Sequence, residues 1–111
     1  FRLLRILPSL KRNVVIECEM FDSFIGEQDF VAGSYVWGPP EPTHPIIVND
    51  ALVHVRQNLF DFLRASRRPL QKRVIWIGAL CINQNDNDEK SHQVQAMDHI
   101  YRQATAVYSW L

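Results

Sequence analysis

One stretch of the chain, from residue 74 to residue 111, most constrains the fold. It begins with the run Val74–Ile77, whose Val, Ile and Trp side chains are typical of a strand buried on both faces. A polar loop follows, and then apolar residues at helical spacing predict an amphipathic helix of about four turns ending near Ala104. A second apolar run at 106–111 predicts another strand. This order predicts a βαβ unit with a right-handed crossover.

The start of this predicted helix carries a capping pattern. Asp86 and Glu89 are three residues apart, so each side chain can accept a hydrogen bond from the other residue's backbone N–H. Capping accounts for both carboxylates, and Glu89 is therefore assigned no acid–base role.

Shorter patterns precede this stretch. Three strands are expected at residues 2–7, 13–19 and 30–35, and the first two are expected to form a hairpin. A short extended segment is expected at 46–48, followed by a helix that starts at Asn49 or Asp50 and ends near Ser66.

The element order from Phe30 onward is strand, helix, strand, helix, strand. It predicts an α/β layered fold with a mainly parallel sheet. Residues 1–111 are expected to form a single, incomplete domain, because the chain begins at Phe1 and stops within a predicted strand. Within it, residues 1–29 are the N-terminal β-hairpin and loop, and residues 30–111 are a βαβαβ core.

Composition narrows the function classes. Twelve basic and twelve acidic side chains cancel, and no run of Lys or Arg exceeds two residues, so no nucleic-acid partner is expected. No segment approaches the ~20 apolar residues that span a bilayer, and no membrane partner is expected. Basic residues interrupt the N-terminal apolar run, unlike a signal peptide. The two distant cysteines are no disulfide framework, which favours a cytoplasmic location.

A ligand site is expected where the strands of the parallel core end, because open α/β sheets bind ligands outside the carboxyl ends of their strands. The predicted cofactor-binding residues are Ser34, Tyr35, Trp37, Gly38, Asn83 and Gln84. The Trp37 ring can stack on a base or on nicotinamide, and Gly38 allows close backbone approach. The alternatives are that Trp37 fills the core and that Asn83 and Gln84 bond only loop backbone.

Other chemistries lack support in the pattern. His92 and His99 are seven residues apart, but no third ligand is spaced to join them, so no metal site is predicted. Cys81 lies in an apolar run and is interpreted as a buried small hydrophobe, not a nucleophile. Nucleophile-elbow, P-loop and dinucleotide-binding motifs are absent. No catalytic residue is predicted.

Three blocks of sequence resemble the fungal heterokaryon-incompatibility (HET) domain. The second signature block of the HET domain is matched by residues 76–111, WIGALCINQNDNDEKSHQVQAMDHIYRQATAVYSWL. Its first block resembles residues 30–38, FVAGSYVWG, and its usual opening resembles residues 2–8, RLLRILP. Matches in order and at family spacing cover nearly the whole chain.

The resemblance implies a signalling module in non-self recognition and programmed cell death. Its partners would be proteins, through homotypic contacts that can build a homo-oligomer or through an NLR-type or HET partner. HET domains are similar to Toll/interleukin-1-receptor (TIR) domains, which have a flavodoxin-like layered fold, and some of which cleave NAD. The alternative function is therefore an NAD-cleaving enzyme, with NAD as substrate and the catalytic glutamate beyond residue 111. The fragment alone is expected to be inactive.

Two positions depart from the family pattern. Gly78 stands where the family usually has Asp, which removes a carboxylate from the mouth of the expected crevice. Gly33 stands where the family usually has Leu, and it is expected to weaken strand packing. A third hypothesis follows from these departures, namely a remnant that no longer signals.

Overall fold

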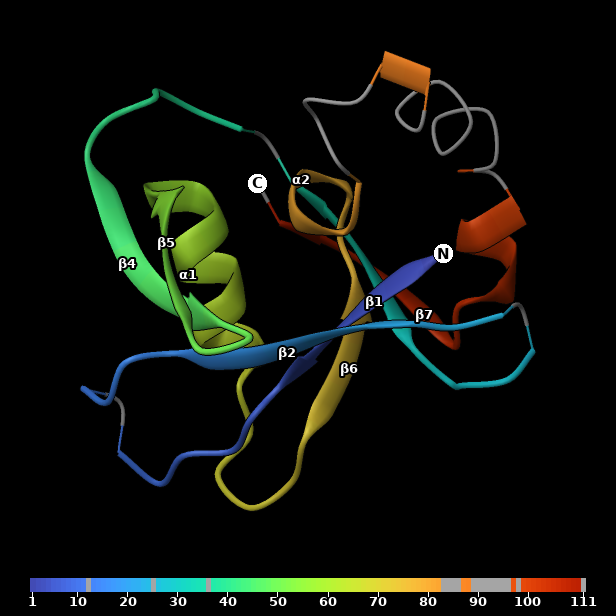
Figure 1. The fold of residues 1–111 in the computed structure, drawn as a ribbon, viewed down its shortest axis with the longest axis horizontal. Helices are drawn as coiled ribbons and strands as arrows, with labels where there is room; N and C mark the ends of the chain where they lie inside the picture. Colours follow the sequence, from blue (N-terminus) through green and yellow to red (C-terminus); the bar gives the residue numbers. More distant parts are fainter. Residues whose placement is uncertain are drawn as a thin grey trace.

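The described part of the chain forms an α/β structure around one mixed sheet (Figure 1). In this computed structural model it comprises residues 1–11, 13–24, 26–35, 37–82, 87–88, 97 and 99–110. The strands are β1 (Arg2–Ile6), β2 (Glu17–Asp22), β3 (Val31–Tyr35), β4 (Thr43–Val48), β5 (Ala51–Arg56), β6 (Arg73–Trp76) and β7 (Ala106–Trp110). The helices are α1 (Gln57–Ser66) and α2 (Gly78–Cys81), and residues 99–103 are also helical.

The strand order across the sheet is β5-β4-β2-β1-β6-β3-β7. Strand β3 pairs in parallel with β6 and with β7, and β2 pairs in parallel with β4. The pairs β1–β2, β1–β6 and β4–β5 are antiparallel. The expected α/β class is therefore confirmed, but the expectation of a mainly parallel sheet is wrong, because two hairpins and the long-range pairing of β1 with β6 add three antiparallel pairs.

The predicted helix from Asn49 or Asp50 is wrong up to Arg56, where the chain forms a turn and then strand β5. Asn49 and Asp50 have φ angles of 50° and 64°, as a two-residue type I′ hairpin turn requires. The Asn49 side chain accepts from the Met20 N–H at 2.8 Å and donates to the Met20 carbonyl at 3.3 Å. The turn thus joins β4 to β5 and fastens the hairpin to β2, which delays the helix to Gln57.

The N-terminal hairpin is confirmed, because β1 and β2 pair antiparallel from Arg2–Asp22 to Ile6–Cys18. The second strand begins at Glu17 and not at residue 13 as expected. Upstream of it, the Arg67 side chain donates to the Val14 carbonyl at 2.7 Å. The backbone there is held by the end of α1 and not by a neighbouring strand.

Helix α1 packs on the sheet through its buried residues Leu59, Phe62 and Leu63. A Cβ added at Gly33 would lie 2.6 Å from Phe62 Cζ, which is closer than side chains tolerate. Gly33 therefore does not loosen the sheet as expected, because the Phe62 ring fills the space that a side chain at position 33 would need.

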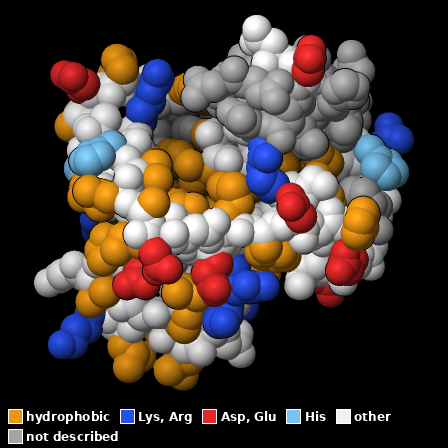
Figure 2. All heavy atoms as spheres, viewed as in Figure 1, with side chains coloured by type: hydrophobic (Ala, Val, Ile, Leu, Met, Phe, Trp, Pro, Cys, Tyr) orange, Lys and Arg blue, Asp and Glu red, His pale blue; other side chains and the backbone are white. Residues whose placement is uncertain are grey.

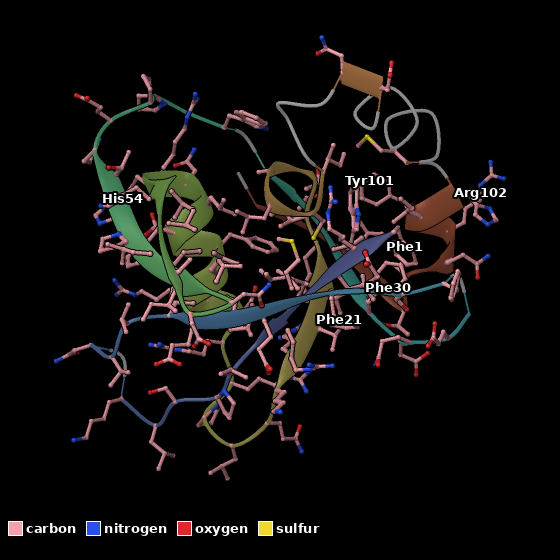
Figure 3. The ribbon with its side chains drawn as sticks, viewed as in Figure 1. Phe1, Phe21, Phe30, His54, Tyr101 and Arg102 are labelled. Atoms are coloured by element: carbon pink, nitrogen blue, oxygen red, sulfur yellow. The ribbon has the colours of Figure 1, made fainter. Side chains whose placement is uncertain are left out.

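Trp76, which is fully buried, anchors packing around the end of β6. Its ring meets Tyr101 edge to face, with centroids 5.5 Å apart, and Tyr101 belongs to the helical residues 99–103. Nearby, Phe1 and Phe30 also meet edge to face, with centroids 5.5 Å apart (Figure 3). The strands predicted at 74–77 and 106–111 are confirmed as β6 and β7. The predicted helix cap at Asp86 and Glu89 lies outside the described residues.

Candidate functional site

The predicted site lies where β3 and β6 end. These strands are parallel, so their carboxyl ends reach the same edge of the sheet. Strand β3 lies between β6 and β7, which follow it in the chain, so the chain order reverses there. In open α/β sheets such a reversal opens a crevice at the carboxyl ends of the strands.

Ser34 and Tyr35 form the end of β3, as predicted. The side chain of Ser34 is exposed, and its backbone lies opposite Ser109 of β7. Tyr35 is the last residue of the strand, while its side chain lies outside the described residues. Ser34 is therefore available at the rim of this edge.

Trp37 and Gly38 continue from β3 towards the start of α1. Trp37 is 48% exposed, so the alternative of a core-filling ring is wrong. The Arg56 guanidinium carbon lies 5.2 Å from the Trp37 ring centroid, and Arg56 Nη1 donates to the Gly38 carbonyl at 3.1 Å. A cation and an open aromatic face therefore lie side by side. Trp37, Gly38 and Arg56 together are called the Trp37–Arg56 corner.

Gly38 is required at this corner for two reasons. Its φ of 71° lies in the left-handed region, and an added Cβ would lie 2.6 Å from Asn58 Nδ2. The expected close backbone approach at Gly38 is thus observed, although the group approached is the first turn of α1.

The N-terminus of α1 makes the corner electropositive. Arg56 is the N-cap residue, no side chain caps the helix, and the first turn carries no acidic residue. The helix dipole places partial positive charge at the same end. The arrangement can therefore accommodate an anionic group beside the Trp37 ring.

A polar chain supports this end of α1. The ring Nε2 of His44 hydrogen-bonds Gln57 Oε1, and Gln57 Nε2 donates to Asp61 Oδ1 at 2.8 Å. The His44 ring also stacks on Phe60, with centroids 4.5 Å apart. Strand β4 thereby holds the helix turn that begins beside Arg56.

Sequence reasoning missed Arg56 and Asn58 because it placed the start of the helix too early. The signal that would have found them is the Asn49-Asp50 pair, since both residue types tolerate the left-handed conformation of a tight hairpin turn. A hairpin at that point moves the helix N-terminus, and its charge, to Arg56.

The second predicted loop is described only up to Ile82. Asn83 and Gln84 lie outside the described residues, so their part in the crevice stays a prediction. An added Cβ at Gly78 would lie 3.5 Å from Ile82 Cδ1 and 3.5 Å from Trp76, which is ordinary contact. The backbone at Gly78 thus leaves room for a Cβ atom, as the aspartate that the family usually carries there would require.

Cys81 is fully buried, which confirms its interpretation as a small hydrophobe. Burial raises the pKa of the Cys81 thiol to about 12, and burial likewise raises the pKa of Cys18 to about 12. Both thiols are therefore protonated at neutral pH and are poor nucleophiles.

Two further features concern metal ligands and membrane-spanning helices. Among the described residues, no three His, Cys, Asp or Glu side chains group as metal ligands. No helix in those ranges is long and apolar enough to cross a membrane. Basic and acidic side chains are interspersed on the face seen in Figure 2.

Comparison with known proteins decides the family. The sequence profile described as "Heterokaryon incompatibility protein (HET)" matches residues 30–111. The chain belongs to the HET family. It is also 39% identical over 95 residues to "Heterokaryon incompatibility protein 6, OR allele" of Neurospora crassa. That match covers 74% of this chain and 14% of the relative, and no solved structure matches the chain.

Proposed function

We propose that this HET chain is a signalling module that triggers programmed cell death in fungal non-self recognition. The family match carries the proposal, because residues 30–111 include β3, α1, β6 and β7, and so include the strand ends that form the candidate site. The Neurospora crassa relative is itself named as a heterokaryon incompatibility protein. A cytoplasmic location and a TIR-like complete domain belong to the same proposal.

The proposed partner is a protein, either a second HET domain or an NLR-type protein. Trp and Arg are the residue types that contribute most often to binding hot spots, and Trp37 and Arg56 stand together with the Trp37 ring half exposed. A partner that covers this corner would desolvate both side chains together.

An expression experiment tests this function. The full-length protein that carries this chain is induced in Neurospora crassa, and growth arrest and vital-dye uptake are scored. Arg56→Gln should suppress cell death, because it removes the cation at the corner. The matched control is Arg64→Gln, in the helix that follows Arg56, where the Arg64 guanidinium carbon lies 5.7 Å from the Phe60 ring centroid. Equal cell death from both variants would refute the assignment of the corner.

NAD cleavage is the second candidate function. An open indole ring beside a cation and an uncapped helix N-terminus suits a ligand with aromatic rings and a pyrophosphate, as in NAD. We infer a catalytic glutamate beyond residue 111 from the proposed similarity to TIR domains, so NAD cleavage would need the longer protein.

Nicotinamide release from NAD by the full-length protein, under induced oligomerisation, separates the two functions. Release that depends on a downstream glutamate would establish NAD cleavage. If only a Gly78→Asp variant releases nicotinamide, the native protein has lost the ability to cleave NAD. No release from either, together with Arg56-dependent cell death, would leave the signalling role alone.

A further inference from the structure

A cleft of about 370 Å³ lies between α1 and the edge strand β7. Phe62, Ala65 and Ser66 line it from the helix, and Tyr108 and Ser109 line it from β7. Arg73, the first residue of β6, also lines it. Arg73 lies at the amino end of β6, whereas Ser109 lies opposite Ser34 in the β3–β7 pair, so the cleft runs from beneath the candidate site towards the other edge of the sheet.

Arg73 brings an unsatisfied cation to the cleft. Its Nε is buried and has no hydrogen-bond partner among the described residues. Its guanidinium carbon lies 5.0 Å from the Tyr108 ring centroid, a cation–π contact that does not supply a hydrogen-bond acceptor for Nε. A buried N–H donor without a hydrogen-bond partner is costly, and a carboxylate matches a guanidinium through two parallel hydrogen bonds.

The walls of the cleft select the rest of the ligand. Phe62 is 2% exposed and Tyr108 is 44% exposed, so the rings offer one closed and one open aromatic wall. Ser66 is buried and adds a hydroxyl from the last turn of α1. Apolar walls with one cation favour an organic anion over a fully hydrated inorganic anion, and the volume is at the small end of ligand pockets.

We propose that this cleft binds a small organic acid with a flat apolar body. Its carboxylate pairs with Arg73, and its body lies between Phe62 and Tyr108. The inference does not depend on the function proposed above, since it is argued from Arg73 and the two aromatic walls and not from Trp37 or Arg56.

Benzoate is the probe for this site, and the readout is the backbone amide NMR spectrum of the ¹⁵N-labelled chain. Benzoate should shift the amides of residues 65–66, 73–74 and 107–109 in a saturable way, with a dissociation constant on the order of 1 mM. Benzyl alcohol, which keeps the ring without the charge, and acetate, which keeps the charge without the ring, should bind at least ~10-fold more weakly.

Two variants locate the binding. Arg73→Gln should weaken benzoate binding ~10-fold or more, because it removes the charge-assisted pair. Ala65→Phe, at an exposed position of α1, should block the cleft without disturbing the core. Arg102→Gln, in the helical residues 99–103, is the matched control and should bind as the native chain does (Figure 3). If Arg73→Gln does not fold, Ala65→Phe decides alone.

Three outcomes would overturn the proposal. The first is no saturable benzoate shift at these amides. The second is equal binding of benzyl alcohol, which would mean unspecific apolar partition. The third is saturable binding of N-acetylglutamate amide without binding of benzoate, which would assign the cleft to an acidic side chain of a protein partner.

Discussion

The two halves of the sheet are stabilised in different ways. In the half made of β5, β4, β2 and β1, the hairpins β4–β5 and β1–β2 join strands that are close in sequence. In the half made of β6, β3 and β7, every pair is parallel and joins residues far apart in the chain. The first half thus consists of two hairpins joined by the parallel β2–β4 pair, whereas no pair of the second half is local and α1 packs against it.

The two halves also differ in their relation to the candidate site. The parallel half ends at the edge where Ser34, Trp37 and Gly38 lie, and the family match begins at residue 30, just before β3. The hairpin half supplies Arg56 to that edge as the last residue of β5. We therefore expect substitutions in the hairpin half to act through stability, and substitutions at the edge to act through function.

The largest effect is expected from Phe62→Ala, which should lower the free energy of unfolding by about 3–5 kcal/mol. Phe62 is 2% exposed and fills the space over Gly33, so its removal leaves a cavity under α1. Urea denaturation followed by circular dichroism measures the loss. A loss below about 1 kcal/mol would show that the parallel half does not depend on this contact.

A smaller effect is expected from Gly33→Ala, which should cost about 1–3 kcal/mol through overpacking against Phe62. The matched control is Gly78→Ala, where the new methyl group meets atoms no closer than 3.5 Å and lies in helix α2. The control should be neutral or should stabilise the chain by up to about 1 kcal/mol. The reverse order in denaturant midpoints would contradict the packing described for β3.

In the hairpin half, Asn49→Ala should cost about 1–2 kcal/mol. Alanine disfavours a φ of 50°, and the variant loses both hydrogen bonds to Met20. Asn49→Gly keeps the turn and loses only the hydrogen bonds, so it should cost less. If Gly proves as costly as Ala in thermal unfolding, the turn conformation does not limit this half.

The smallest effect is expected from the titration of a single thiol over one pH unit. The two thiols concerned are Cys18 of β2 and Cys81 of α2. Both thiols have pKa values raised from 9.0 to about 12 in the folded chain by burial. Above pH 9 the unfolded chain therefore loses these protons first. Stability is complete below pH 9 and should fall towards pH 12 by about 1 kcal/mol per pH unit for each thiol.

Denaturation at pH 7, 9 and 10.5 measures this slope. Cys81→Ala should be less stable at pH 7 because it leaves a cavity, but its slope above pH 9 should be about half that of the native chain. An unchanged slope would exclude Cys81 as a source of the alkaline sensitivity.

Sequence reasoning predicted the elements whose signals are local and unambiguous. Strands β1, β3, β6 and β7 follow from apolar runs between Pro, Gly and polar breaks. Strand β5 was missed because Leu52, Val55 and Leu59 have helical spacing across a junction where a strand becomes a helix. Mixed pairing could not be predicted, because β1 reaches β6 only through contacts distant in sequence.

The candidate site divides in the same way. Ser34, Trp37 and Gly38 were predicted from a general rule about strand ends, and the structure brings Trp37 and Gly38 together with Arg56. Arg56 itself could not be assigned without the correct start of α1. Asn83 and Gln84 remain predictions.

The most direct test of the separation between support and function compares Trp37→Ala with Asn49→Ala in the full-length protein, induced in Neurospora crassa. Cell death is measured per molecule of folded protein, from dye uptake and protein abundance. We expect that Trp37→Ala abolishes cell death at native abundance, whereas Asn49→Ala lowers abundance but keeps the activity of each remaining molecule. Full activity of Trp37→Ala at native abundance would contradict the central claim that the Trp37–Arg56 corner is where this HET module acts.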